Sequence, residues 1–574
     1  MKKLLIYLKG YVKESILAPL FKLLEASFEL FVPIVIKRIV DIGIGQADTK
    51  YAVRMGLLLV LLAVVGIICS VTAQYFAAKA AVGFSTKLRH ALFKHIGGLS
   101  YTEYDTLGTS SLITRMTSDV NQVQNGINLT LRLLLRSPFI VLGSMIMAFM
   151  VDASAAVTFV VAIPILSVIV FAIMLISIPL YKKVQKKLDK VLATTRENLT
   201  GVRVIRAFRL EEKEKAEFDN YNEDLTSTLR FVGRISALMN PLTYVVINLA
   251  IIWLIHIGAI RVSAGLLTQG AVLALYNYMS QILVELIKFA NLIISINKAF
   301  ASANRISSVL DIKSSIVESN TDVNKTSSEY AIQFRNVSLR YKDAGSEALT
   351  SIDFKVRHGE TVGIIGGTGS GKSSLINLIP RFYDATSGEV IINGINVKDY
   401  PLKQLRDKIG IVPQKAVLFS GSLRQNMLMG KKDATDEEIM EAIHIAQAAD
   451  ILASKKEGLD MHIEQGGKNL SGGQRQRFSI ARALVKKPDI LILDDSASAL
   501  DFATDAALRK ALKNIPYKPT IFIVSQRTSS IMHADKIIVL DDGEIAGIGT
   551  HDELLKTCKV YKEIYDSQFK KEGR

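Results

Sequence analysis

The chain has 574 residues, which is too long for one hydrophobic core and indicates two or three domains. A mean hydropathy of +0.27 with 22% charged residues excludes an ordinary cytosolic enzyme and indicates membrane-spanning segments. The formal net charge of +16 fits cytoplasmic loops rich in Lys and Arg, as is usual in a membrane protein, and no nucleic-acid partner is expected.

The cysteines and the N-terminal residues exclude further classes. Cys69 and Cys558 lie far apart in the sequence, so there is no disulfide framework and no zinc-binding spacing. The basic start, Met1-Lys2-Lys3, is not followed by a short apolar core with a cleavage site, and we expect no cleaved signal peptide. Because the first apolar stretch begins near residue 15, we also expect no N-terminal peptidase segment.

Six apolar stretches before residue 300 are each long enough to cross a hydrocarbon core of about 30 Å. They lie near residues 15–40, 55–80, 132–152, 154–180, 238–262 and 268–295. Two long connections, about 82–130 and 182–236, are expected to be helical continuations of these spans beyond the bilayer. Since Lys and Arg are abundant in the second connection, the positive-inside rule places both connections and both termini in the cytoplasm.

Charged side chains interrupt the first and the last of these spans. Glu25 and Glu29 lie one helical turn apart, and Glu285 lies three residues before Lys288 and close to Asn291. Charges inside a membrane usually face a bundle interior or a watery cavity. A structural ion pair explains Glu285 and Lys288 equally well, and Glu25 and Glu29 could instead lie at the membrane rim.

The last span also carries polar and aromatic side chains that could line a cavity, although helix packing explains them at least as well. These residues are Tyr276, Tyr278, Met279, Phe289 and Asn291. The membrane half contains no cluster of His, Met or Cys that would select a metal, and His256 stands alone and is expected to be structural.

The composition changes after residue 300. The polar stretch 312–328 predicts a linker, and the expected domains are a membrane domain at 1–311, a linker at 312–329 and a nucleotide-binding domain at 330–574. Strand-like and helix-like segments alternate in the last of these, as in an α/β domain. The predicted fold class is therefore an all-α six-helix transmembrane domain followed by an α/β P-loop NTPase domain.

Residues 366–373 read G-x-x-x-x-G-K-S, the phosphate-binding P-loop, between a strand-like segment at 361–365 and a helix-like segment at 374–379. Glycines let backbone N–H groups surround phosphate oxygens, and the helix N-terminus adds positive potential. Lys372 would reach the terminal phosphates, and the Ser373 hydroxyl would bind Mg²⁺. The residues expected to bind the nucleotide here are Gly366, Gly367, Thr368, Gly369, Ser370, Gly371, Lys372, Ser373 and Ser374.

Three further segments add to this site. The apolar strand at 490–494 ends in Asp494, which in P-loop proteins is the acid that holds Mg²⁺. The buried strand at 520–524 is followed by Ser525 and Gln526. Between the P-loop and Asp494, residues 470–474 read L-S-G-G-Q and precede a helix, where a hydroxyl and bare N–H groups can face an anion.

With the P-loop, L-S-G-G-Q and the aspartate strand, nearly the whole chain resembles the ATP-binding cassette (ABC) transporter family. A membrane domain fused to a C-terminal ATPase on one chain is the half-transporter arrangement of ABC exporters (type IV fold). The resemblance implies ATP and Mg²⁺ as cofactors and a second, facing ATPase domain whose bound ATP contacts the signature. The signature residues are Leu470, Ser471, Gly472, Gly473 and Gln474.

The resemblance also assigns roles outside these motifs. Tyr341 is expected to stack on adenine, and a core tyrosine is the alternative; Gln414 is expected to contact Mg²⁺ and to sense the membrane domain. Residues 110–120 and 197–208 look like the intracellular loops whose coupling helices dock on the ATPase domains, the second on the opposite subunit. Residues 464–467 look like the segment that touches these loops. The loop expected to cross to the partner's site consists of Ser498, Ala499, Leu500 and Asp501.

Two catalytic positions depart from the family pattern. Asp495 stands where the family usually has the glutamate that polarises the attacking water, and Gln526 stands where it usually has a histidine. The shorter carboxylate falls about 1–1.5 Å short, which can cost on the order of 10²-fold in rate, and an amide cannot carry imidazolium charge. We therefore expect slow or no hydrolysis at this chain's own site, while the intact signature completes the partner's site.

These expectations describe the degenerate-site subunit of a bacterial heterodimeric multidrug exporter in the cell membrane. The expected partner is a second half-transporter with intact glutamate and histidine, and the expected substrate is a small amphipathic or lipophilic drug, lipid or peptide in contact with membrane lipid. Alternatives are a homodimeric exporter with slow ATPase activity, and a regulatory or channel-like ABC protein gated by ATP. The apolar half argues against a soluble ABC ATPase.

Overall fold

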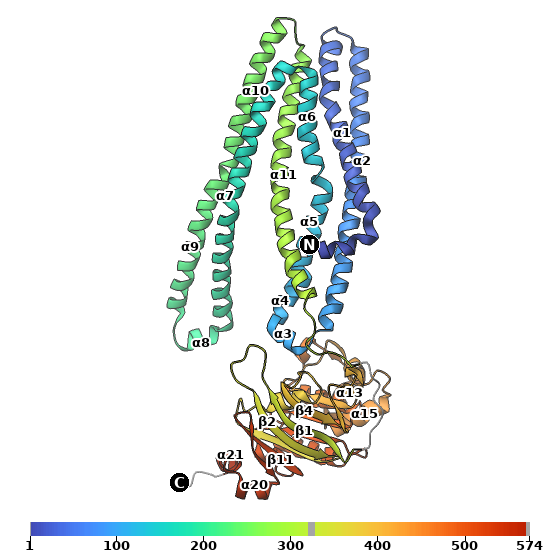
Figure 1. Ribbon diagram of the computed structural model, residues 1–574, viewed down its shortest axis with the longest axis vertical. Coiled ribbons are helices and arrows are strands. Elements are labelled where there is room, and N and C mark those ends of the chain that lie inside the picture. The colour runs from blue at the N-terminus through green and yellow to red at the C-terminus, as the bar shows by residue number, and fades with distance from the viewer. Residues whose placement is uncertain (1, 320–327, 570–574) are drawn as a thin grey trace. The chain divides into compact units, whose positions relative to one another are not determined.

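The computed structural model describes residues 2–319 and 328–569, which divide into two compact units (Figure 1). The first unit consists of Met1–Gly97 and Ser110–Ile312, and the second consists of Gly98–Thr109 and Lys313–Arg574. The short helix α3 (Tyr101–Leu107) therefore belongs to the second unit, although the chain reaches it within the helical half. Much of the predicted linker, residues 320–327, lies outside the described residues.

The first unit is helical throughout its described residues. Its long helices are α1 (Val12–Arg38), α2 (Thr49–Gly97), α5 (Val120–Leu133), α6 (Arg136–Val151), α7 (Ala153–Thr200), α9 (Glu211–Ala237), α10 (Met239–Ser263) and α11 (Gln269–Leu310). Its shorter helices are η1 (Lys2–Tyr11), η2 (Ile39–Ile44), α4 (Thr109–Thr114), η3 (Arg115–Asp119) and α8 (Val202–Ala207). Helices such as α2, with 49 residues, confirm that the predicted spans continue as helices into the long connections.

Within the described residues, five helical stretches are long and apolar enough to cross a membrane. They are Thr49–Gly97, Thr109–Val151, Ala153–Thr200, Glu211–Ser263 and Gln269–Leu310, and they contain the last five predicted spans. The first predicted span, 15–40, forms helix α1, which is not among the five. Charged side chains within α1, including Lys22, Glu25 and Glu29, lower its mean hydropathy.

Small residues let the membrane helices pack closely. On α2, Ala73, Ala77 and Ala80 are fully buried, which is the small-residue spacing that lets helix backbones approach each other in a membrane. Tyr278 and Met279 on α11 are also fully buried among neighbouring helices, and the Tyr278 hydroxyl donates a 2.6 Å hydrogen bond to a backbone carbonyl of α1. The cavity role is therefore wrong for these two residues, and the packing explanation holds.

The second unit contains, among residues 328–569, a six-stranded sheet in the order β12-β11-β3-β10-β9-β6 and a four-stranded sheet in the order β2-β1-β4-β5. The first six strands are β1 (Tyr330–Leu339), β2 (Leu349–Arg357), β3 (Thr361–Gly366), β4 (Ser387–Ile392), β5 (Ile395–Asn396) and β6 (Ile409–Val412). The others are β7 (Gly421–Ser422), β8 (His462–Ile463), β9 (Ile490–Asp494), β10 (Thr520–Val524), β11 (Lys536–Asp541) and β12 (Glu544–Gly549).

Helices accompany these sheets. They are α12 (Lys372–Leu378), α13 (Leu402–Asp407), α14 (Leu423–Leu428), α15 (Asp436–Ile445), α16 (Ala449–Ala453), α17 (Gly472–Leu484), α18 (Phe502–Lys513), α19 (Thr528–Ile531), α20 (His551–Thr557) and α21 (Lys559–Phe569). Strands β3, β9 and β10 are parallel neighbours made almost wholly of buried apolar residues, as expected for a sheet covered on both faces.

Candidate nucleotide-binding site

The residues predicted to bind nucleotide gather at one edge of the six-stranded sheet. The P-loop, residues 366–373, begins at the last residue of β3, and Asp494 is the last residue of β9. Gln414 comes two residues after β6, and Gln526 comes two residues after β10. Because β3, β10, β9 and β6 are parallel neighbours, their carboxyl ends meet at the same edge, where ligands bind in open α/β sheets.

The P-loop backbone requires glycine at two positions. A Cβ atom on Gly366 would collide with the carbonyl oxygen of Leu540 on β11. Gly371 has a φ of +91°, and a Cβ atom there would lie 2.7 Å from the carbonyl oxygen of Ala348. The loop can therefore run close to the neighbouring backbone and turn directly into the N-terminus of α12.

Lys372 lies inside this loop. Its Nζ donates hydrogen bonds to the carbonyl oxygens of Gly366 at 2.9 Å and Gly367 at 2.5 Å. Burial lowers the pKa of the Lys372 amine, while Asp495 and Asp494 act in the opposite direction. The ammonium group is thus already positioned within the loop that would surround the phosphates.

Ser373 and Asp494 offer oxygen donors for a cation. The Ser373 hydroxyl lies 3.3 Å from Asp494 Oδ2, and burial raises the pKa of Asp494. Within the described residues no group of three His, Cys, Asp or Glu side chains could hold a metal ion by itself. This sparse set of oxygen donors fits Mg²⁺, which usually takes one or two protein ligands together with phosphate oxygens and water.

Asp495 is fixed by its backbone. Its φ is +44°, its N–H donates to the Val524 carbonyl oxygen at 3.0 Å, and its own carbonyl accepts a 2.8 Å hydrogen bond from the Ser498 hydroxyl. Burial raises the pKa of the Asp495 carboxyl, and Gln414 Nε2 lies 3.4 Å from Asp495 Oδ2. Because the backbone of Asp495 is held by these hydrogen bonds, the length of its side chain decides how far its carboxylate extends from the sheet edge.

Gln526 has an exposed side chain and a backbone that is tied to the last described helix. Gln568 of α21 donates from Nε2 to the Gln526 carbonyl at 2.7 Å. Gln568 Oε1 also accepts hydrogen bonds from the Thr528 backbone N–H at 2.8 Å and from the Thr528 hydroxyl at 2.6 Å. Sequence reasoning missed Gln568, because no local pattern links it to a loop more than forty residues earlier.

The signature residues form the start of α17. Ser471 caps this helix: its hydroxyl accepts from the Gln474 N–H at 3.3 Å, and Gln474 Oε1 accepts from the Ser471 N–H at 3.1 Å. Ser471 and Gly472 are exposed, and a Cβ atom on Gly473 would lie 3.0 Å from the carbonyl oxygen of Ala499. The signature thus packs against the loop 498–501, and its exposed residues lie at a helix N-terminus, where an anion is favoured.

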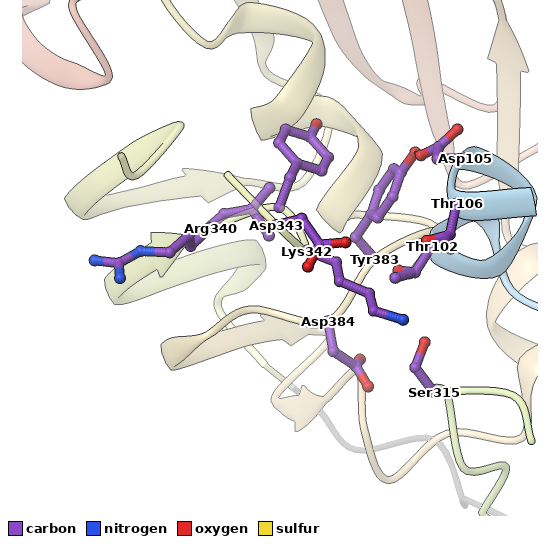
Figure 2. A pocket seen from close by; sticks show the side chains of 11 residues that line it. Thr102, Asp105, Thr106, Ser315, Arg340, Lys342, Asp343, Tyr383 and Asp384 are labelled. Carbon is purple, nitrogen blue, oxygen red and sulfur yellow. The ribbon is translucent and has the colours of Figure 1, made fainter. Parts of the chain in front are cut away.

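Tyr341 is one of the residues that line a cavity of about 450 Å³. Its hydroxyl donates to Ser374 at 2.9 Å, and its ring packs edge-on against Tyr383 with centroids 5.1 Å apart. Figure 2 shows Tyr383 pointing toward Asp105 of α3, to which its hydroxyl donates a 2.6 Å hydrogen bond. Burial raises the pKa of Tyr383. One chain of contacts therefore joins the P-loop helix to α3.

Helix α3 corrects the expected position of the first coupling helix. Residues 110–120 were expected to carry it, but they lie in the first unit, and the segment that packs on the ATPase unit is Gly98–Thr109. The Tyr101 ring lies 4.6 Å from that of Phe382, centroid to centroid. The predicted coupling segment, 110–120, thus begins one short helix after the segment that packs on the ATPase unit, because the sequence of α3 has no strong pattern of its own. Helix α8 forms inside the other expected segment, 197–208, and its docking on an opposite subunit remains a prediction.

Ion pairs connect the charged residues of the membrane helices. Arg136 donates to Glu29 at 2.7 Å and to Glu285 at 2.6 Å, and Lys288 donates to Glu285 at 2.8 Å. The predicted Glu285–Lys288 pair is thus confirmed. Sequence reasoning missed Arg136, although an arginine inside a predicted span is itself a signal of a buried partner.

Family models match both halves of the chain. The model described as "ABC transporter transmembrane region" matches residues 15–286, and the model described as "ABC transporter" matches residues 349–498. An uncharacterized ABC transporter ATP-binding protein, YfiB of Bacillus subtilis, is 37% identical over 100% of this chain and 99% of its own length. The chain belongs to the ABC transporter family.

Two further comparisons describe its neighbours among ABC transporters. The putative multidrug export ATP-binding/permease protein YgaD of B. subtilis is 31% identical over 99% of both chains. The solved structure of a bacterial Atm1-family ABC exporter with ATP bound has a TM-score of 0.81 at 23% identity and covers 98% of this chain and 99% of its own, so it shares the fold. The predicted fold class is confirmed: a helical transmembrane domain of a multi-pass membrane protein is followed by an ABC ATPase domain, with the exporter fold.

Proposed function

We propose that this ABC transporter is one half of a heterodimeric, ATP-driven exporter that moves amphipathic or lipophilic compounds out of the cell. The observation that carries the proposal is the short, backbone-fixed carboxylate of Asp495 together with the neutral, exposed side chain of Gln526. Both stand at the sheet edge where the γ-phosphate would be cleaved. The name of YgaD, a putative multidrug exporter, is consistent with the proposed substrate class.

In this proposal the chain's own site holds Mg-ATP without cleaving it efficiently. Residues 366–374 would bind the phosphates, Tyr341 would contact adenine, and Ser373, Gln414 and Asp494 would hold the Mg²⁺, which would supply positive charge to the phosphates. Asp495 is too short to polarise the attacking water well. Because Gln526 is neutral, the γ-phosphate also lacks a positive neighbour there.

The chain's larger catalytic contribution is to a site on its partner. Ser471 and the N–H groups of Gly472 and Gly473 would bind the γ-phosphate of ATP held by the partner, and the loop 498–501 would cross to the same site. ATP thus holds the two ATPase domains together, and hydrolysis at the partner's site separates them. The membrane cavity opens alternately inward and outward with this cycle, and both termini lie in the cytoplasm.

The test is the ATPase activity of the purified full chain in lipid nanodiscs, alone and together with a candidate second half-transporter that carries the usual glutamate and histidine. We expect little turnover from the chain alone and substantial turnover from the pair. Lys372→Ala should leave the activity of the pair largely intact, since the partner's own P-loop is unchanged. Brisk turnover by the chain alone, abolished by Lys372→Ala, would overturn the proposal and establish a homodimeric exporter. Substrate flux down a gradient without hydrolysis would instead establish a channel-like protein.

A further inference from the structure

A polar pocket lies between α1 and α11 within the membrane unit. Its volume is about 290 Å³. Its polar lining consists of Glu29 from α1 and of Asn277, Ser280, Gln281, Glu285 and Lys288 from α11. Polar and charged side chains are costly inside a membrane and persist where they serve a pathway or a ligand. We call this space the α1–α11 pocket.

Both carboxylate oxygens of Glu285 accept hydrogen bonds from residues other than Lys288. Arg136 spans the two carboxylates of Glu29 and Glu285, and the Ser137 hydroxyl donates to the second Glu285 oxygen at 2.9 Å. Glu285 thus already accepts a hydrogen bond on each oxygen before Lys288 is counted. Lys288 therefore adds a third donor to Glu285 and balances the charge of the second carboxylate, while its side chain also borders the pocket.

The pocket is bordered by a positively charged donor and a negatively charged acceptor that can each form a further hydrogen bond. The Lys288 side chain is 44% exposed and the Glu29 side chain is 39% exposed, although each makes one ion pair. Among the described residues, Gln281 Oε1 is a buried acceptor without a hydrogen-bond partner. An ammonium on α11 and a carboxylate on α1 therefore border the same space and can each take a further partner.

We propose that the α1–α11 pocket binds the dipolar headgroup of a zwitterionic amphiphile, with the anionic group at Lys288 and the ammonium group at Glu29. The four charges of Glu29, Arg136, Glu285 and Lys288 sum to zero, so a ligand without net charge preserves neutrality in a low-dielectric region. This proposal names the headgroup chemistry of the substrate. It rests on the proposed function, because the bound amphiphile is a transported substrate only if the protein is an exporter.

Ligands of other charge fit this pocket less well. A cationic headgroup at Glu29 places no anion at Lys288, and an anionic headgroup at Lys288 places no cation at Glu29. A neutral sugar-like headgroup offers Lys288 and Glu29 no charged partner beyond the ion pair that each already makes. The pocket therefore selects a zwitterionic headgroup in two ways: both charges of this headgroup find a partner, and headgroups of other charge leave Lys288 or Glu29 without a further one.

The test uses photoreactive probes with one common alkyl chain and different headgroups: phosphocholine, trimethylammonium, phosphate or maltoside. The full chain is placed in nanodiscs of phosphatidylglycerol, and adducts on α1 and α11 are quantified by mass spectrometry over a range of probe concentrations. We expect half-maximal labelling by the phosphocholine probe at about tenfold lower concentration than by the singly charged probes, because each matched charge adds one charge-assisted hydrogen bond.

Two substitutions assign the two ends of the ligand. Lys288→Gln should make the phosphocholine and trimethylammonium probes equal, and Glu29→Gln should make the phosphocholine and phosphate probes equal. Both variants should fold, because Glu285 keeps Arg136 and a glutamine at 29 can still accept from Arg136. The matched controls are Lys79→Gln and Glu14→Gln, which break a 2.9 Å ion pair between α2 and α1 outside the pocket and should leave the preference unchanged.

Further experiments distinguish a membrane lipid from a water-soluble amphiphile as the natural ligand. They also keep the test of this inference independent of the test of the proposed function. Phosphatidylethanolamine added to the nanodiscs should compete with the phosphocholine probe if the natural ligand is a membrane lipid; no competition identifies a water-soluble amphiphile. Equal labelling by all four probes, or a preference that survives both substitutions, would overturn the inference. Binding is measured here without ATP or the partner, so its failure leaves the ATPase test of the proposed function unaffected, and the reverse is also true.

Discussion

Lengthening the carboxylate at position 495 should restore hydrolysis to this chain's own site. The perturbation is Asp495→Glu, alone and with Gln526→His. Because the Asp495 N–H is held to the Val524 carbonyl at 3.0 Å, the backbone stays in place and only the side chain grows. The added methylene moves the carboxylate outward by about 1–1.5 Å, the distance by which it falls short.

The expected gain follows from this distance. A misplacement of about 1 Å can cost on the order of 10²-fold in rate, so the double variant should recover roughly that factor. Asp495→Glu alone should recover about tenfold, since the γ-phosphate still faces a neutral amide at 526. The φ of +44° suits aspartate better than glutamate, and a slightly lower thermal stability should accompany the gain.

The assay is steady-state ATP hydrolysis by the full chain assembled with itself in nanodiscs. In that homodimer each P-loop faces an intact signature, so residues 495 and 526 are the positions that differ from the family pattern. Lys372→Ala in the double variant should abolish the gain. Asp489→Glu is the matched control, because Asp489 is 60% exposed, pairs with Lys408 at 3.5 Å and should not change turnover. Unchanged hydrolysis by a double variant that still binds ATP would refute the reasoning.

Three further predictions concern stability and binding. Ser471→Ala should lower the stability of the ATPase unit by about 1 kcal/mol through loss of the α17 cap, measured by denaturant unfolding, and should slow hydrolysis at the partner's site. Gly371→Ala should abolish binding of a fluorescent ATP analogue, because the new Cβ atom meets backbone and φ is +91°; wild-type affinity would contradict this. Arg136→Met should destabilise the membrane unit by about 3 kcal/mol in thermal unfolding, whereas Arg136→Met with Glu285→Met should recover most of the loss.

The strength of a local pattern decided how much of the fold was predictable. Apolar runs longer than a bilayer predicted six spans. Five of them lie in helical stretches long and apolar enough to cross a membrane, and the first lies in α1, where Lys22, Glu25 and Glu29 lower the mean hydropathy. Strands β3, β9 and β10 could be expected from their buried apolar sequences. The assignment of Gly98–Thr109 to the ATPase unit could not, because the contacts of α3 join residues nearly three hundred positions apart.

In the candidate site, too, the residues within local motifs were predictable, and the residues whose partners are distant in sequence were not. The P-loop and signature were recognisable because their chemistry needs fixed residue types at fixed spacing. Gln568 and Arg136 were missed because their partners are distant in sequence and their residue types are common. The roles of the nucleotide-binding residues stay predictions. Because neighbouring parallel strands end at one edge of the sheet, Gln414, Asp494 and Gln526 lie at that edge although they are spread over more than one hundred residues.

The composition of the ATPase unit has a practical consequence for exchanging parts between half-transporters. Residues 98–109 supply Tyr101 against Phe382, Asp105 against Tyr383 and Ser100 2.8 Å from Ser315. A chimaera joined once, near residue 312, would combine a foreign ATPase domain with the wrong α3. A viable exchange needs a second junction pair around Gly98–Thr109, so that the docked segment travels with the domain on which it folds.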